Sequence, residues 1–91
     1  MVNIDLIIEG VPDRAIENAI RKRVRAFGRR FQRSGDCRVC LRPSEVRGEW
    51  DLGIRGALRW HLASFAASVE GLPDVVERTL DELGIGLALE S

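Results

Sequence analysis

Residues 13–33 carry the most regular apolar pattern in the chain, and the rest of the fold has to be built around it. Apolar side chains recur at spacings of four, four, three and four, namely Ile16, Ile20, Val24, Phe27 and Phe31. At the 3.6-residue period of an α-helix these positions form a single stripe, which predicts an amphipathic helix with one buried face. Asp13 is suited to cap its start, and Ser34-Gly35 is suited to end it.

Four other segments alternate between apolar and polar side chains, as half-buried strands do. They are residues 2–9, 37–42, 49–55 and 58–67. In the last segment Phe65 is out of phase with Trp60, so the pattern leaves open which side chains face the core. A second helix is predicted from Gly71-Leu72-Pro73-Asp74 to a C-cap at Gly84, followed by an apolar tail that forms a short strand or a packed coil.

The resulting order, β-α-β-β-β-α, predicts an α+β fold: a four-stranded mixed sheet with two helices packed on one face. A helix between the first two strands implies a parallel crossover, and the next two connections are hairpins. Because each strand alternates, the other face of the sheet is expected to meet solvent. With 91 residues we expect one domain, with a core at about residues 2–83 and a tail at 84–91. A ferredoxin-like βαββαβ fold, whose enzyme version would be an acyl-phosphate hydrolase, requires residues 49–66 to form one strand, which Gly53 and Gly56 disfavour.

Composition excludes several classes of protein. Hydrophobic residues make up 45% and charged residues 31% of the chain, a globular balance. No apolar run approaches the ~20 residues that a membrane-spanning helix needs, and the first residues do not read as a secretory signal. Two cysteines cannot form a multi-disulfide framework, so the expected location is the cytoplasm.

No pattern in the sequence indicates catalysis, a metal or a cofactor, and a non-enzymatic protein is expected. The single histidine, His61, lies within a strand and is predicted to be structural, and nothing marks a serine as an activated nucleophile. Cys37 and Cys40 have C-x-x-C spacing, but residues three apart on a strand point to opposite faces and cannot share a metal. Gly53-x-x-Gly56 falls in a hairpin, where we expect it to serve a bulge or a turn.

Charge is sorted along the chain. Fourteen basic and fourteen acidic residues cancel, yet residues 14–33 carry a net charge of +7 and residues 70–91 a net charge of −5. A cationic helix face is typical of phosphate binding, and we expect it to contact RNA. The candidate RNA-binding residues are Arg14, Arg21, Lys22, Arg23, Arg25, Arg29, Arg30, Arg33 and Arg42. The alternative left open is that acids of the second helix neutralise this face.

Several local motifs, taken with the element order, resemble the ribosome hibernation-promoting factor family, also called ribosome-associated inhibitor or ribosomal subunit interface proteins. The matching segments are Asn3-Ile4-Asp5-Leu6, Phe31-Gln32-Arg33, Val39-Cys40-Leu41-Arg42 and His61-Leu62-Ala63-Ser64. The resemblance implies a protein of the stress response that binds ribosomal RNA in the decoding channel of the small subunit and silences idle ribosomes. It also implies RNA contacts for Arg23, Arg33 and Arg42, which match commonly basic positions.

The second helix departs from that family, because Asp74, Glu77, Asp81 and Glu82 stand where members usually carry lysines. A second function therefore stays open: a protein-interaction or homodimerisation domain that uses this acidic helix and the apolar tail at residues 85–91. The main expectation is a ribosome-associated protein that acts on translation without chemistry.

Overall fold

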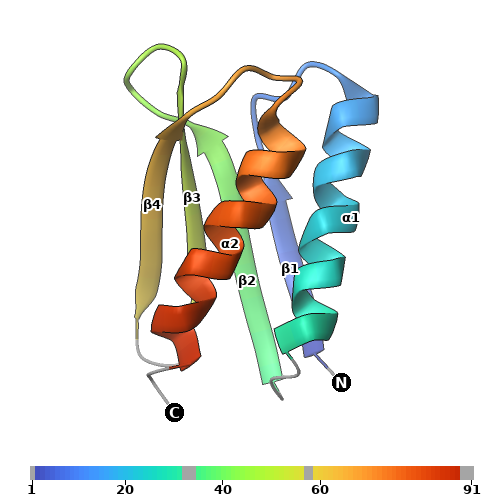
Figure 1. Ribbon diagram of the computed structural model, residues 1–91, viewed down its shortest axis with the longest axis vertical. Coiled ribbons are helices and arrows are strands. Elements are labelled where there is room, and N and C mark those ends of the chain that lie inside the picture. The colour runs from blue at the N-terminus through green and yellow to red at the C-terminus, as the bar shows by residue number, and fades with distance from the viewer. Residues whose placement is uncertain (1, 32–34, 57–58, 89–91) are drawn as a thin grey trace.

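The computed structural model describes residues 2–31, 35–56 and 59–88. The elements are β1 (Val2–Ile8), α1 (Arg14–Phe31), β2 (Gly35–Pro43), β3 (Glu49–Arg55), β4 (Trp60–Ala66) and α2 (Leu72–Ala88). The strands form one sheet in the order β1-β2-β3-β4, with β1 parallel to β2 and the other pairs antiparallel. Both helices cover the same face of this sheet (Figure 1). The predicted α+β class and element order are confirmed, and the ferredoxin-like alternative is wrong because β3 and β4 are separate strands.

The core lies between the two helices and the covered face of the sheet. The apolar stripe of α1 supplies Ile20, Val24 and Phe27, all buried. Leu72, Val76 and Leu80 of α2 meet them. Asp13 caps α1 as predicted, since its Oδ1 accepts the backbone N–H of Ala15 at 2.8 Å and that of Ile16 at 3.4 Å. Burying these apolar side chains is the main source of stability, and it fixes which side of each helix remains outside.

Strand register determines the two faces of the sheet. Residues opposite each other on neighbouring strands share a face, and Val39, Leu41, Leu52 and Ile54 all lie buried under the helices. The residues that alternate with these four along β2 and β3 point to the uncovered face, which we call the open face. Cys37 packs against the core, whereas Cys40 lies on the open face, so the prediction that the two thiols point apart is confirmed.

The phase of β4, which the sequence left open, is set by its pairing with β3. Ile54 pairs with His61 and Gly53 pairs with Leu62. His61 and Phe65 therefore face the helices, while Trp60 and Leu62 lie on the open face. The strand carries its largest apolar side chain away from the core, and this arrangement builds the depression described below.

The second helix is longer than predicted. It runs through the expected C-cap at Gly84 as far as Ala88, so the tail predicted as a strand or coil is helical over its first residues. Gly84 is buried, and a methyl group at Gly86 would lie 3.2 Å from Nδ1 of His61. Packing of this last turn against β4 outweighs the poor helix propensity of the two glycines.

Candidate nucleic-acid interface

The cationic residues predicted to bind RNA are divided among different sides of the molecule. The buried stripe of α1 fixes this division, because each residue projects at an angle set by its distance along the helix. One group lies along the side that faces α2, a second group points outward, and one residue is on the other face of the sheet. Arg33 lies outside the described residues.

Arg23 and Arg30 lie on the side of α1 that faces α2, where they pair with three carboxylates of that helix. Arg23 contacts Asp74 at 2.8 Å and also binds Glu77. Arg30 contacts Asp81 at 2.8 Å and Glu77 at 3.5 Å. Glu77 is shared between the two guanidinium groups, so the four contacts form a ladder along the junction of the helices. For these two residues the alternative interpretation holds: acids of the second helix occupy them.

The hydrogen bond to Glu77 raises the pKa of Arg23 above the usual arginine value, against the opposing effect of desolvation, and the charges of Glu77 and Asp74 add to the rise. A raised pKa means that folding favours the charged guanidinium. The associated stabilisation is present at all pH values below the ordinary arginine pKa and is lost only as the pH rises through the raised value. Arg23 is therefore a permanently charged partner of α2.

Four other cations of α1 point away from both α2 and the sheet. Arg14, Lys22, Arg25 and Arg29 are exposed, and none of them forms an ion pair with another described residue. Arg21 lies beside them and is bound to Glu17 of its own helix at 3.2 Å. We call Arg14, Lys22, Arg25 and Arg29 the outward cations; Arg21 is not one of them. At 1.5 Å of rise per residue they extend over about 22 Å of helix.

Arg42 lies apart from the α1 residues, on the open face of the sheet. It pairs in register with Asp51 of β3, but no ion pair joins the two side chains. Arg42 therefore does not share a surface with the α1 residues, since the sheet lies between them. The phase of β2 places it there, because Arg42 alternates with the buried Leu41.

The described residues hold no cluster of three or more His, Cys, Asp and Glu side chains that could bind a metal ion. His61 is buried on the helix side of the sheet and lies beside Gly86. Across residues 2–31, 35–56 and 59–88, neither helix is long and apolar enough to cross a bilayer.

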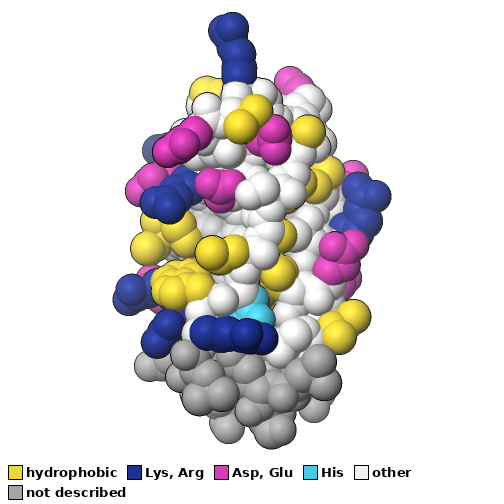
Figure 2. Space-filling view, turned by 90° about the vertical axis from the view of Figure 1, so that its left-hand side faces the viewer, with side chains coloured by type: hydrophobic (Ala, Val, Ile, Leu, Met, Phe, Trp, Pro, Cys, Tyr) yellow, Lys and Arg dark blue, Asp and Glu magenta, His cyan; other side chains and the backbone are white. Residues whose placement is uncertain are grey.

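The open face contains a depression that was not predicted from the sequence. Its volume is about 470 Å³, and it is lined by Cys40, Arg42, Asp51, Gly53, Trp60, Leu62, Ala63 and Ser64. Seen from the β4 side, hydrophobic side chains gather along this edge of the molecule with lysine and arginine side chains beside them (Figure 2). We call this depression the sheet basin. The exposed apolar residues of β4 gave a signal for it, but only the register with β3 brings them to Gly53.

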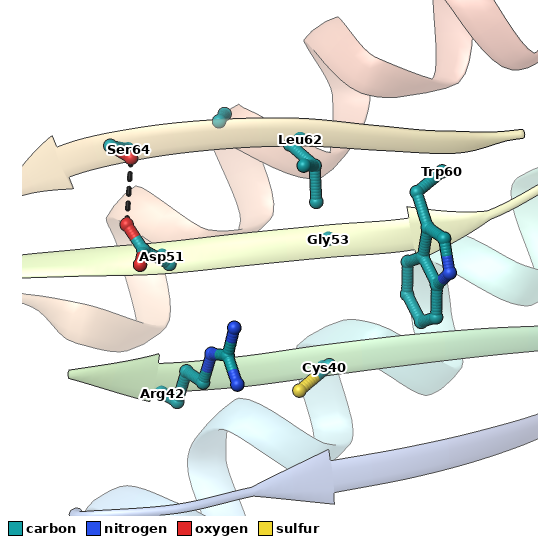
Figure 3. A pocket seen from close by; sticks show the side chains of 8 residues that line it. Cys40, Arg42, Asp51, Gly53, Trp60, Leu62 and Ser64 are labelled. Carbon is teal, nitrogen blue, oxygen red and sulfur yellow. Dashed lines mark hydrogen bonds between the residues drawn. The ribbon is translucent and has the colours of Figure 1, made fainter. Parts of the chain in front are cut away.

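Gly53 forms the floor of the sheet basin. It lies in the middle of β3 with regular pairing on both sides, so the expected bulge is absent there. A methyl group on this residue would lie 2.8 Å from Cδ2 of Leu62 and 3.2 Å from Cε3 of Trp60. The missing side chain thus lets the indole reach across β3 toward Cys40 and β2 (Figure 3). At the other end, Ser64 donates its hydroxyl hydrogen to Oδ1 of Asp51 at 2.7 Å.

Comparison with known proteins adds no relative: no family model matches this chain, and no curated protein matches it in sequence. The candidate interface therefore rests on the geometry above.

Proposed function

We propose that this chain is a non-enzymatic, cytoplasmic RNA-binding protein that associates with the small ribosomal subunit and silences translation. The outward cations of α1 carry the proposal. They are exposed and unpaired within the described part of the chain, and they follow one another along a rigid helix. Phosphate contacts by such residues dominate the affinity of proteins for RNA and require no sequence-specific chemistry.

The ladder between α1 and α2 supports the same interpretation. It neutralises the two arginines nearest to the second helix and uses three of that helix's carboxylates. The acidic helix thus compensates one side of α1 and leaves the outward side cationic. The local motifs shared with hibernation factors are what direct the proposal to the ribosome among RNA targets.

Co-sedimentation with purified small ribosomal subunits tests this function. The protein should pellet with the subunits at low salt and dissociate as the salt concentration rises. Reversing two outward cations, Arg25→Glu with Arg29→Glu, should remove binding. The control is Arg47→Glu with Arg78→Glu, which reverses two exposed arginines elsewhere on the surface and should leave binding nearly intact.

Two results would overturn the proposal. One is a failure to pellet with the subunits at low salt. The other is an equal loss of binding in both double variants. That result would show that binding depends on the net charge of the protein and not on the outward face of α1. A translation assay with added protein should show inhibition by the wild type and by the control variant only.

The second candidate is a homodimerisation domain that uses residues 85–91, and one observation favours it. Ile85 in the last turn of α2 is 68% exposed, which is unusual for a large apolar side chain. Leu89 lies outside the described residues. Sedimentation velocity over a range of protein concentrations discriminates: self-association that is lost in Ile85→Ser supports the dimer, and a monomer at all concentrations excludes it.

A further inference from the structure

We propose that the sheet basin binds an unpaired nucleobase of single-stranded RNA, with the base stacked on Trp60. This inference rests on the proposed function, because it names a second contact with the same class of ligand. It concerns the open face of the sheet, on the side opposite α1. The outward cations would read the phosphate backbone, and the sheet basin would hold a base that is not in a helix.

The indole of Trp60 is the stacking surface. Its side chain is 39% exposed. The neighbouring Leu62, at 72%, is the most exposed large apolar side chain among the described residues. The indole crosses β3 over Gly53 and forms one wall of the sheet basin (Figure 3). Exposed aromatic rings on a sheet are the usual platform for unpaired bases, because every base offers a flat π face.

Gly53 lets two apolar side chains of β4 lie close to the sheet, and this close packing shapes the hollow. Any other residue there would project from the floor and push Leu62 and Trp60 outward, since even a methyl group would lie only 2.8 Å from the first and 3.2 Å from the second. Glycine in a strand interior weakens the strand and often marks a close approach by a ligand or by another part of the chain. Here the approach is by Trp60 itself, and the result is a hollow of about 470 Å³, within the size range of small-ligand sites.

The far end of the sheet basin offers hydrogen-bonding groups. The guanidinium of Arg42 extends over the gap between β2 and β3, toward Gly53 (Figure 3). It donates no hydrogen bond to a carboxylate of the described residues. The nearest acidic partner in register, Asp51, accepts its hydrogen bond from Ser64. Arg42 can therefore donate to a base edge or a phosphate, and the second oxygen of Asp51 can accept from an amino group of the base. An apolar wall facing a polar edge matches the two sides of a nucleobase.

The charges around the sheet basin favour a polyanion over an apolar peptide. Arg55 pairs in register with both Arg38 and Trp60, which places two arginines beside the indole. Arg38 is bound to Asp5 at 3.2 Å, whereas Arg55, like Arg42, has no ion-pair partner among the described residues. Phosphates on either side of a bound base would thus meet unpaired guanidinium groups.

Tryptophan fluorescence provides a direct test with three probes: a single-stranded RNA oligomer, an RNA duplex, and adenosine monophosphate. Trp50 is only 7% exposed, so quenching by an added base reports on Trp60. The single strand should quench the emission, and the duplex should bind with little quenching. In Trp60→Phe the quenching should disappear while binding remains, because phenylalanine also stacks.

Affinities from labelled oligomers complete the test. Trp60→Ala should weaken binding of the single strand by about tenfold or more, the usual loss for a stacked base. Gly53→Ala should weaken it similarly, and duplex binding should change little in either variant. Val46→Ala, which trims an exposed apolar side chain in the loop before β3, is the matched control and should bind like the wild type.

The outcomes separate the two proposals. Unchanged single-strand affinity in Trp60→Ala, with binding still lost on reversal of the outward cations, overturns the nucleobase site alone. Absence of binding to both RNAs overturns both proposals. Saturation by the mononucleotide at the same concentration as the oligomer assigns the sheet basin to free nucleotides and overturns the assignment to an RNA strand. Concentration-dependent self-association that blocks the quenching overturns it in favour of a second copy of the chain.

Discussion

The division of the α1 arginines into paired and outward groups predicts how RNA affinity depends on salt. Each cation that neutralises a phosphate releases counterions, so the slope of log K against log salt counts the contacts. If the outward cations Arg14, Lys22, Arg25 and Arg29 each neutralise one phosphate, together they contribute about −2.8 to the slope on a single strand and about −3.6 on a duplex. Between 50 and 200 mM salt this corresponds to a loss of affinity of about 50- to 150-fold.

Two double variants of equal charge change distinguish the groups. Arg25→Gln with Arg29→Gln removes two of the outward cations, so the slope should lose about half of the outward cations' contribution. Arg23→Gln with Arg30→Gln removes the two arginines that α2 already neutralises, so the slope should stay within about half a unit of the wild type. Both variants should remain folded, because partly exposed ion pairs contribute little to stability.

The assay is fluorescence anisotropy of a labelled RNA duplex, titrated at four or more salt concentrations, with far-ultraviolet circular dichroism as the control for folding. An equal fall in slope in the two variants would refute the reasoning, since it would show that the ladder opens when RNA binds. A wild-type slope near zero would refute it more broadly, because the outward cations would then make no phosphate contacts.

Four further predictions concern stability and are measured by urea unfolding. Leu80→Ala should lower the free energy of unfolding by about 2–5 kcal/mol, because the side chain is fully buried between helix and sheet; a loss below about 1 kcal/mol would contradict that packing. Asp13→Ala should cost about 1 kcal/mol through loss of the helix cap, and Asp13→Ser should restore most of it. Gly48→Ala should cost about 1–2 kcal/mol, because the residue has a φ of 82° in open space. Gly10→Ala should cost more, because at a φ of 76° its methyl group would also overlap the ring of Pro43; equal losses would argue against that overlap.

The ion-pair ladder gives the acidic second helix a specific part in the molecule. Asp74, Glu77 and Asp81 lie within reach of arginines on α1, and the two helices pack against each other over the sheet (Figure 1). Partly exposed pairs add little stability, so their main consequence is electrostatic. They neutralise the arginines of α1 along the junction of the two helices. The positive charge that remains on α1 lies on its outward side. An RNA strand would therefore be directed to that side.

Most of the fold follows from local patterns. The 3.6-residue stripe of α1 and the period-two alternation of β2 and β3 each identify an element and its buried face, since burial of apolar side chains controls both. The predicted cap at Asp13 and the opposed thiols of Cys37 and Cys40 follow from the same geometry. The predictions were wrong at two glycines whose local structure was predicted from the glycine's own conformational preference. Gly84 does not end α2, and Gly53 makes no bulge, because packing against other elements decided both.

The sequence by itself determined the order of the elements, the buried faces of α1, β2 and β3, and the concentration of positive charge in one helix. These properties depend on residues close together along the chain. Only the tertiary structure decided which arginines remain unpaired, because Arg23 and Arg30 meet carboxylates more than forty residues away. Strand pairing likewise decided that Trp60 lies over Gly53 on the open face. Both outcomes depend on contacts between distant segments, for which a single sequence carries no periodic signal.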